Sequence, residues 1–138
     1  MSTIVYISNA IQLFEEEELE ELFVLTKSTN TLKDITGILF YRDGTFMQIL
    51  EGRKSEIEEL FERIQQDARH NNITKILKRN VDERLFTSYQ TGFSVFKNYK
   101  ELDRLESFLK QHNNSSHAQT ILALLTPFLN ERRITNSN

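Results

Sequence analysis

Residues 35–50, with the sequence ITGILFYRDGTFMQIL, decide the fold of this chain. Two runs rich in Ile, Leu, Phe and Met, residues 35–41 and 45–50, flank the dipeptide Asp43-Gly44. An Asp-Gly pair tolerates the positive φ angles that a tight turn requires. The segment therefore predicts a hairpin of two antiparallel strands.

One strand and one helix are predicted before this hairpin. Residues 3–8, TIVYIS, are β-branched and aromatic, which is typical of a buried strand. The acidic run at residues 15–18 fits the positively polarised first turn of a helix, which we expect to end at residues 28–32. Core-facing side chains recur at helical spacing inside it, at Leu19, Leu22, Phe23 and Thr26.

A second helix and two further strands are predicted after the hairpin. Ser55 and Glu58 form a capping-box pattern for a helix that runs to about residue 68. The apolar stripe of this helix comprises Ile57, Leu60, Phe61 and Ile64. Residues 73–81 and 86–96 carry enough Ile, Val and Phe for two strands.

The order strand-helix-strand-strand-helix-strand, with one added strand, predicts an α+β fold. This order is typical of a ferredoxin-like sandwich, in which both helices pack on one face of an open sheet. A fold of this kind does not by itself indicate a function.

The pattern changes after residue 98. Apolar residues recur at helical spacing at Leu102, Leu105, Phe108 and Leu109, and again at Ile121, Leu122, Leu125, Phe128 and Leu129. Residues 113–116 separate the two predicted helices, and Ser116 is a suitable N-cap. We therefore expect a domain at residues 1–98 and a two-helix extension at residues 99–138. Two short amphipathic helices cannot bury their stripes alone, so they pack either on the free face of the sheet or in a homo-oligomer.

Composition excludes several kinds of chemistry. The chain has 138 residues, a formal net charge of -3, no Cys and no Trp. Without Cys it has no disulfide, thiolate nucleophile, thiolate-zinc site or cysteinyl cofactor adduct. His70, His112 and His117 are too scattered for a metal cage, so we expect no metal.

Charge and hydropathy limit the expected partners. Lys and Arg are dispersed and form no basic stripe, which argues against a nucleic-acid partner. The sequence has no apolar run of about 18 residues and no signal peptide at its start. We therefore expect a soluble, cytoplasmic protein without a membrane partner.

Two polar side chains lie in strands that otherwise carry core residues. Gln48 falls on the same strand face as Phe46 and Leu50, so its amide is expected to be buried. A buried amide without partners costs about 1–3 kcal/mol. Tyr6 has a similar requirement in the first strand, because its hydroxyl needs a partner. Either each group is satisfied within the core, or the two bond to each other and present polar atoms to a ligand held between sheet and helices.

Charged residues gather at the end of the second predicted helix. Arg63 and Asp67 are four residues apart and border its apolar stripe, so they form either a surface ion pair or the edge of a binding site. Arg69 and His70 suit the negative end of the helix dipole and would equally suit a phosphate.

Asn30 and three glycines fall in or near predicted turns. We expect Asn30 to adopt a left-handed conformation in the turn after the first helix. Gly37, Gly44 and Gly52 are spread over the hairpin without the spacing of a phosphate-binding loop. We expect Gly37 to let a helix approach the sheet closely.

Over about residues 1–98 the sequence resembles the BLUF domain, a flavin-binding sensor of blue light. Five ordered blocks carry the resemblance: VYISNA at 5–10, Asn30 ahead of DITGILFY at 34–41, GTFMQILEG at 44–52, RIQQDARH at 63–70, and Arg84 with Phe86. The family has the ferredoxin-like fold, with the flavin ring held between its two helices.

The resemblance implies a role for each matching residue. Tyr6 matches the light-active tyrosine, Gln48 the switching glutamine, and Asn30 the side chain that bonds the pyrimidine edge of the flavin. Leu22 and Ile64 match the residues that sandwich the ring, Arg63 and Asp67 match the polar pair near the ring and ribityl chain, and Arg69 and His70 match positions near the phosphate or outer portion of the cofactor. Thr26 is a further expected cofactor-binding residue. The expected cofactor is FAD, with FMN as the alternative.

The resemblance also implies a mechanism without substrate turnover, so we expect no enzyme activity. Tyr6 gives an electron to the photoexcited flavin while a proton passes through Gln48, and recombination leaves Gln48 with changed hydrogen bonds. A phenol can supply an electron and a proton, and an amide can reverse its donor and acceptor ends. The signal then passes to an unidentified downstream protein or changes the assembly.

One departure from the family concerns signal output. On the last strand the family usually has a Trp followed two residues later by a Met, whereas this sequence has Tyr89 and Thr91. In the family, this Met commonly changes places with the Trp or meets the glutamine during signalling. We expect the hydroxyl of Thr91 to meet Gln48 instead of the Met. Loss of the Trp removes a competing electron donor, which predicts little side quenching.

Two other hypotheses fit the same fold. A small phosphatase or flavin reductase would turn over substrate without light, although the sequence has neither a phosphate loop nor a thiol. A flavin-free interaction module would use Tyr6 and Gln48 only as a core pair, and it would stay colourless after flavin reconstitution.

Overall fold

A computed structural model of the chain describes residues 1–11, 14–42, 44–68, 70–86, 93–96, 99–112 and 118–126. The chain divides into two compact units, Met1–Val95 and Phe96–Asn138. The assignment of a flavin-binding domain to residues 1–98 and of an extension to residues 99–138 stays a prediction.

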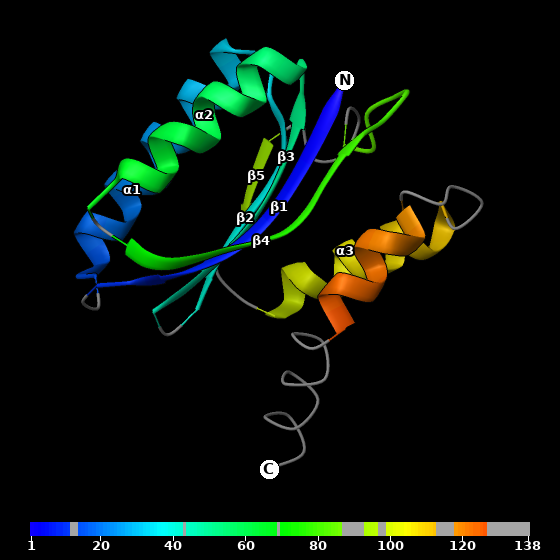
Figure 1. Cartoon of the computed structure of the whole chain (residues 1–138). Helices are drawn as coiled ribbons and strands as arrows, with labels where there is room; N and C mark the ends of the chain where they lie inside the picture. The colour runs from blue at the N-terminus through cyan, green and yellow to red at the C-terminus, as the bar shows by residue number, and fades with distance from the viewer. Residues whose placement is uncertain are drawn as a thin grey trace. The chain divides into compact units, whose positions relative to one another are not determined.

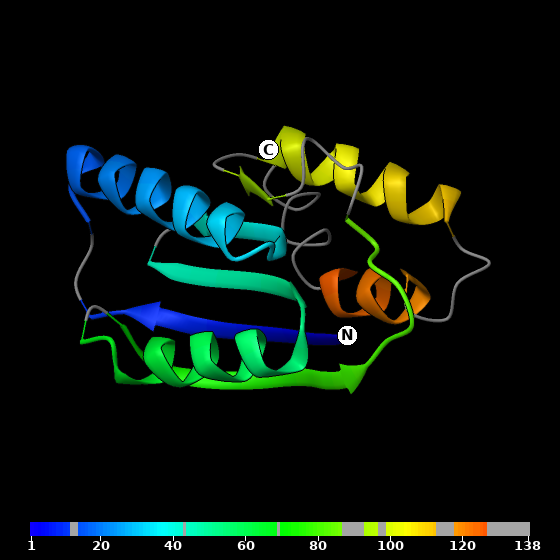
Figure 2. The ribbon, with the colours of Figure 1, turned by 90° about the horizontal axis from the view of Figure 1, so that it is seen from above.

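The first unit is a five-stranded sheet with two helices. Its elements are β1 (Ser2–Ala10), α1 (Glu16–Leu32), β2 (Thr36–Arg42), β3 (Thr45–Gly52), α2 (Lys54–Gln66), β4 (His70–Asn80) and β5 (Phe93–Phe96). The strand order is β4-β1-β3-β2-β5, and the β1–β3, β1–β4 and β2–β3 pairs are antiparallel. Both helices lie on the same face of the sheet (Figure 1) and flank its central strands when seen from above (Figure 2). The ferredoxin-like prediction is confirmed.

The central hairpin forms as the sequence predicts. Strands β2 and β3 pair in a register that sets Arg42 opposite Thr45, and Gly44 between them has a φ of 87°. Gly37 is needed for a different reason from the expected one. Its φ is 142°, and a Cβ atom at this position would lie 1.9 Å from the carbonyl oxygen of Ile49. The close approach is therefore between two strands, not between a helix and the sheet.

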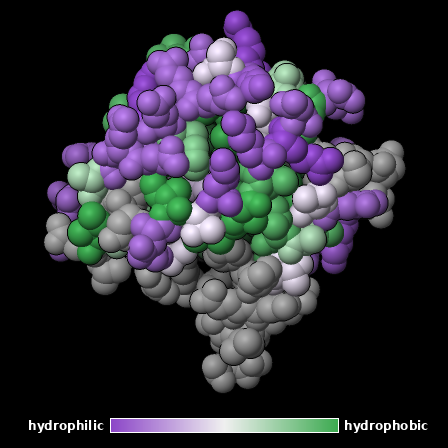
Figure 3. All heavy atoms as spheres, in the orientation of Figure 1, coloured by the Kyte–Doolittle hydropathy of each residue, from purple (hydrophilic) through white to green (hydrophobic). Residues whose placement is uncertain are grey.

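The core of this unit fills the space between the sheet and the two helices. It comprises Ile4, Tyr6, Phe23, Ile35, Leu39, Phe46, Leu50, Ile57 and Phe61. Helix α2 buries Ile57 and Phe61 of its predicted stripe, and Leu60 and Ile64 pack against the same cluster. Its outward surface is hydrophilic (Figure 3), because Glu58, Glu59 and Glu62 are exposed.

Helix α1 ends at Leu32, within the predicted range of residues 28–32. The expectation that Asn30 adopts a left-handed conformation in the turn after the helix is wrong. Asn30 lies within the last turn of α1, where its carbonyl oxygen accepts the backbone N–H of Ile35 at 2.9 Å. The left-handed conformation falls on Asp34, with a φ of 56°.

Helix α2 also differs from its predicted boundaries. The carbonyl of Arg53 accepts the first helical hydrogen bond, from Ile57 at 2.9 Å, so Arg53 and not Ser55 is the N-cap. The helix ends at Gln66, and His70 begins β4 opposite Ala10 instead of lying at the helix end.

The strands that follow α2 differ in extent from the prediction. Strand β4 runs from His70 to Asn80, and the second predicted strand contains β5 at Phe93–Phe96. Phe86 is buried but lies in a bend before it. Arg69, Tyr89 and Thr91 lie outside the described residues.

The second unit is helical where it is described. Helix α3 spans Tyr99–Gln111, and residues 118–126 are also helical. The predicted apolar positions Leu102, Leu105, Leu109, Ile121 and Leu125 are buried. Ser116, proposed as an N-cap, lies outside the described residues.

Two features are absent from the described part of the chain. No helix within it is long and apolar enough to cross a membrane. It also contains no group of three or more His, Cys, Asp or Glu residues arranged to hold a metal ion.

Candidate functional site

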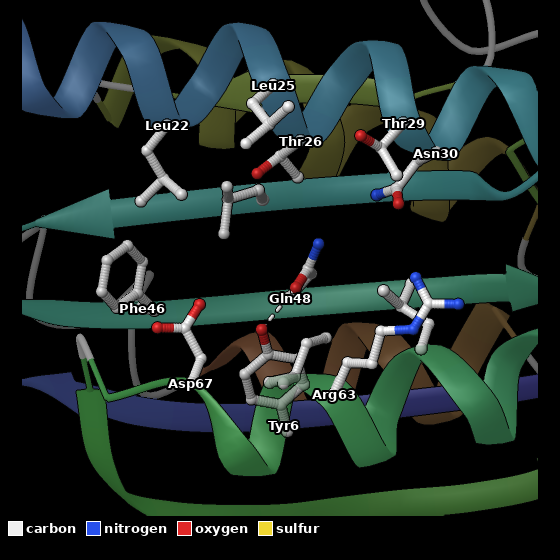
Figure 4. A pocket seen from close by; sticks show the side chains of 13 residues that line it. Tyr6, Leu22, Leu25, Thr26, Thr29, Asn30, Phe46, Gln48, Arg63 and Asp67 are labelled. Atoms are coloured by element: carbon white, nitrogen blue, oxygen red, sulfur yellow. Dashed lines mark hydrogen bonds between the residues drawn. The ribbon is translucent and has the colours of Figure 1, made fainter.

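A cavity of about 300 Å³ lies between α1, α2 and the sheet (Figure 4). Its lining residues are Tyr6, Leu22, Leu25, Thr26, Thr29, Asn30, Leu39, Phe46, Gln48, Leu60, Arg63, Ile64 and Asp67. This volume is at the lower end of the range for small-molecule sites, which are also mostly apolar with a few polar groups. The cavity brings together eight of the residues that the sequence singled out.

Tyr6 and Gln48 form the polar wall of this cavity on the sheet. They are direct partners in the β1–β3 register, and the Tyr6 hydroxyl donates a hydrogen bond to Oε1 of Gln48. Both residues are 3% exposed. In Figure 4 the Gln48 amide nitrogen points away from Tyr6 and toward the side of the cavity formed by α1. The two polar groups therefore satisfy each other and leave the amide nitrogen facing the cavity.

The environment of Tyr6 favours its neutral form. Burial raises the pKa of the phenol, and the negative charge of Asp67 raises the pKa further. The ring packs against Phe61, with 5.6 Å between ring centroids. The hydroxyl therefore keeps its proton at neutral pH and acts as a donor to Gln48.

The Asn30 side chain is suited to a ligand that carries a hydrogen-bond acceptor. The side chain lines the cavity from α1 and is 2% exposed. Its Nδ2 atom is buried and has no hydrogen-bond partner among the described residues. Because an unsatisfied buried donor is costly, the site fits a bound group that brings an acceptor to this position.

Aliphatic side chains form opposite walls of the cavity. Leu22 and Leu25 come from α1, and Leu60 and Ile64 come from α2. Walls of this kind suit a flat, apolar ring inserted between the helices. The cavity thus combines apolar faces with the polar atoms of Asn30 and the Tyr6–Gln48 pair.

Charged residues lie at the α2 side of the cavity. Arg63 and Asp67 both line it, but Arg63 pairs with Glu59, four residues earlier on the helix, and not with Asp67 as the ion-pair alternative supposed. The Arg63 side chain is 52% exposed. Such an exposed pair contributes little to stability, so the guanidinium remains available for a polar group of a ligand.

Two expected cofactor-binding residues cannot be compared with the cavity lining. Arg69 and the side chain of His70, which begins β4, lie outside the described residues. Other residues were missed by the sequence reasoning, namely Leu25, Thr29, Leu39, Phe46 and Leu60. Helical spacing could have found Leu25 and Thr29, which lie three residues after Leu22 and Thr26.

A model of the BLUF family, described as sensors of blue light using FAD, matches residues 1–92. The chain belongs to the BLUF family. Members of this family bind flavin, and the orphaned donor of Asn30 in an apolar cavity agrees with that property.

Similar proteins include both longer and comparable chains. Photoactivated adenylate cyclase subunit beta of Euglena gracilis is 33% identical over 91 residues, which are 66% of this chain and 11% of that protein. A structure of Klebsiella pneumoniae BlrP1 with FMN and cyclic diGMP has a TM-score of 0.72 at 28% identity, covering 93% of this chain and 34% of the other. The photo-activated state of BlsA has a TM-score of 0.66 at 25% identity, covering 88% and 90%. This chain therefore spans only a small part of the curated cyclase.

Proposed function

We propose that this protein is a blue-light photoreceptor that holds an oxidised flavin in the cavity between α1 and α2. The observation that supports it best is the buried Tyr6–Gln48 hydrogen bond, which lies in the same cavity as the unsatisfied Nδ2 of Asn30. A bound flavin supplies absorption of blue light and, when excited, an acceptor for one electron. All further steps are carried by side chains of this chain.

Tyr6 is the proposed electron and proton donor. Its raised pKa keeps the phenol protonated in the dark, and oxidation makes a phenol strongly acidic, so its proton leaves along the bond that already joins it to Gln48. Recombination then returns the electron and the proton to Tyr6, and the neutral Gln48 amide is left with its donor and acceptor ends exchanged, by rotation or tautomerisation. The changed hydrogen bond is the stored signal.

The remaining lining residues are proposed to bind and orient the cofactor. Asn30 donates its free N–H to an acceptor on the ring edge, and Leu22 and Ile64 pack on the ring faces. Arg63 and Asp67 contact the more polar part of the cofactor. We propose FAD because the family description names it, although the BlrP1 structure contains FMN. Mass spectrometry of the flavin released from the purified protein distinguishes the two.

Output is proposed to pass to a downstream protein or through a change in assembly, without substrate turnover by this chain. The relatives differ beyond their sensor region, since one is named an adenylate cyclase subunit and is matched over 11% of its length, whereas BlsA is matched over 90%. Tyr89 and Thr91 are the proposed output residues. Gel filtration in darkness and under blue light tests the assembly alternative directly.

The visible spectrum before and after blue light tests the proposed function. We expect a flavin band that moves to longer wavelength and recovers in darkness, because a new hydrogen bond forms at the ring. Tyr6→Phe and Gln48→Leu should each retain flavin and lose the shift. Tyr41→Phe and Gln65→Leu are matched controls outside the cavity lining, and they should keep it. Irreversible bleaching, or no change in the wild-type spectrum, would contradict the proposal.

A further inference from the structure

Glu51 places a buried carboxylate at the end of the strand that carries Gln48. The residue is 0% exposed and lies three positions beyond Gln48 on β3. Side chains alternate along a strand, so Glu51 faces the side of the sheet opposite to Gln48 and takes no part in the flavin cavity. A carboxylate is rarely buried in this way unless specific partners compensate for its lost hydration.

The partners of Glu51 come from two other segments of the chain. The Thr36 hydroxyl, at the start of β2, donates to Oε1 at 2.7 Å. The backbone N–H groups of Leu85 and Phe86 donate to Oε2 at 2.9 Å and to Oε1 at 2.6 Å. The side chain thus joins β3 to β2 and to the bend that precedes β5.

Arg84 completes this polar cluster from the same bend. Its guanidinium donates to the Thr36 hydroxyl oxygen at 3.1 Å and pairs with Asp34 at 3.2 Å. The Arg84 side chain is 10% exposed, whereas Asp34 is 77% exposed. The nearly buried positive charge of Arg84 is therefore linked to the Glu51 carboxylate through the Thr36 hydroxyl, and it balances the negative charge of that carboxylate.

The hydrogen-bond pattern suits the ionised form of Glu51. Both carboxylate oxygens accept bonds, and the donors are two N–H groups and one hydroxyl. Burial raises the pKa of Glu51 above its ordinary value, and these hydrogen bonds and the Arg84 charge offset only part of that rise. Charge-assisted bonds of this kind are stronger than neutral ones, so the cluster holds the bend firmly against β3.

We infer that Glu51 is a positioning residue of the light switch, which couples β3 to the bend at residues 84–86 and so carries a change at Gln48 toward the chain segment that leads to β5. This inference rests on the proposed function. We expect the bend to respond to a change at Gln48 because its backbone N–H groups donate hydrogen bonds to a side chain of the same strand. A displacement of β3 changes the length of these bonds even though Glu51 does not touch the flavin.

Amide hydrogen exchange of Leu85 and Phe86, measured by NMR in darkness and under blue light, tests the inference in the flavin-loaded 16.3 kDa protein. In the wild type we expect the exchange rates of both amides to differ between dark and light. In Glu51→Gln the flavin band should still shift, but dark exchange should be about tenfold faster or more, since a bond to a charged acceptor is worth at least that factor. The difference between dark and light should be lost. Glu58→Gln makes the same chemical change at an exposed carboxylate and should behave as wild type.

A matched pair at residue 36 keeps the test valid if Glu51→Gln does not fold. Thr36→Val removes one donor to the carboxylate and should reduce the light-dependent difference, whereas Thr36→Ser retains the hydroxyl and should restore it. The inference is overturned if light shifts the flavin band but leaves exchange at Leu85 and Phe86 unchanged in the wild type. It is equally overturned if the variants speed exchange in both states and keep the full difference, as a purely structural role would. Absence of the band shift in the wild type overturns the proposed function and this inference together.

Discussion

Replacing Asn30 by leucine should stabilise the flavin-free protein while weakening flavin binding. The Nδ2 atom is buried without a hydrogen-bond partner among the described residues, and such a group costs about 1–3 kcal/mol. Leucine has the same number of side-chain heavy atoms in the same branched arrangement, and it has no unsatisfied donor. The free energy of unfolding of the flavin-free Asn30→Leu variant should therefore rise by about 1–3 kcal/mol.

The same substitution removes the donor that is proposed to meet the flavin. A ligand acceptor that is buried without its partner loses a similar 1–3 kcal/mol, so the Kd for flavin should rise about 5- to 150-fold. Urea denaturation of the flavin-free protein and titration by flavin fluorescence measure the two quantities. Thr31→Leu, on the exposed side of α1, controls for the helix propensity of leucine. A variant that is less stable than wild type and binds flavin equally well would refute the argument, because Asn30 would then serve the fold and not the ligand.

Three further outcomes are expected. The pKa of Tyr6 is raised above its ordinary value of 10.0, so just above pH 10 the folded protein keeps the phenol proton while the unfolded chain loses it. The free energy of unfolding should therefore fall in this range by up to about 1.4 kcal/mol per pH unit. Denaturation of the wild type and Tyr6→Phe between about pH 9 and 11 checks this, and equal slopes would contradict it. Gly37→Ala should cost about 3 kcal/mol or more or prevent folding, since its Cβ would meet a carbonyl oxygen at 1.9 Å. Gly52→Ala, with no atom nearer than 3.5 Å, should change the thermal midpoint little. Transient absorption should show little side quenching in the wild type; fast quenching that Tyr89→Phe abolishes would show that this tyrosine replaces the missing Trp as a competing donor.

The polar pair at the centre of the site could be predicted because strand geometry is regular. Alternation puts Gln48 on the face of Phe46 and Leu50, and a buried amide next to a buried phenol has few ways to be satisfied. The register that makes Tyr6 the direct partner of Gln48 depends on how β1 aligns with β3 over eight residue pairs, which no local pattern determines. The sequence therefore predicts that the Tyr6 hydroxyl and the Gln48 amide both need a buried partner, but it leaves their bond to each other as one of two hypotheses.

The errors at helix ends have a common physical cause. The side chains of Ser55 and Asn30 predict a cap and a turn at these positions. The boundaries are instead set by the backbone carbonyls of Arg53 and Asn30, which accept bonds from residues four and five positions later. Ser55 lies inside the helix, and the left-handed turn falls on Asp34, whose carboxylate pairs with Arg84. Long-range partners of this kind are invisible to reasoning over a few adjacent residues.

The burial of Glu51 could be predicted from the sequence, but its hydrogen-bond partners could not. Alternation puts Glu51 on the same strand face as Met47 and Ile49, and a charged residue on an otherwise apolar face could have marked it as one with buried partners. Its donors, however, lie 15 residues before it and 34 and 35 residues after it, so only the folded sheet brings them together. Strand β3 consequently carries two polar networks on opposite faces, one around Gln48 and one around Glu51. Because a strand moves as a connected unit with its side chains fixed in alternation, a shift that repacks one face must also strain the bonds on the other.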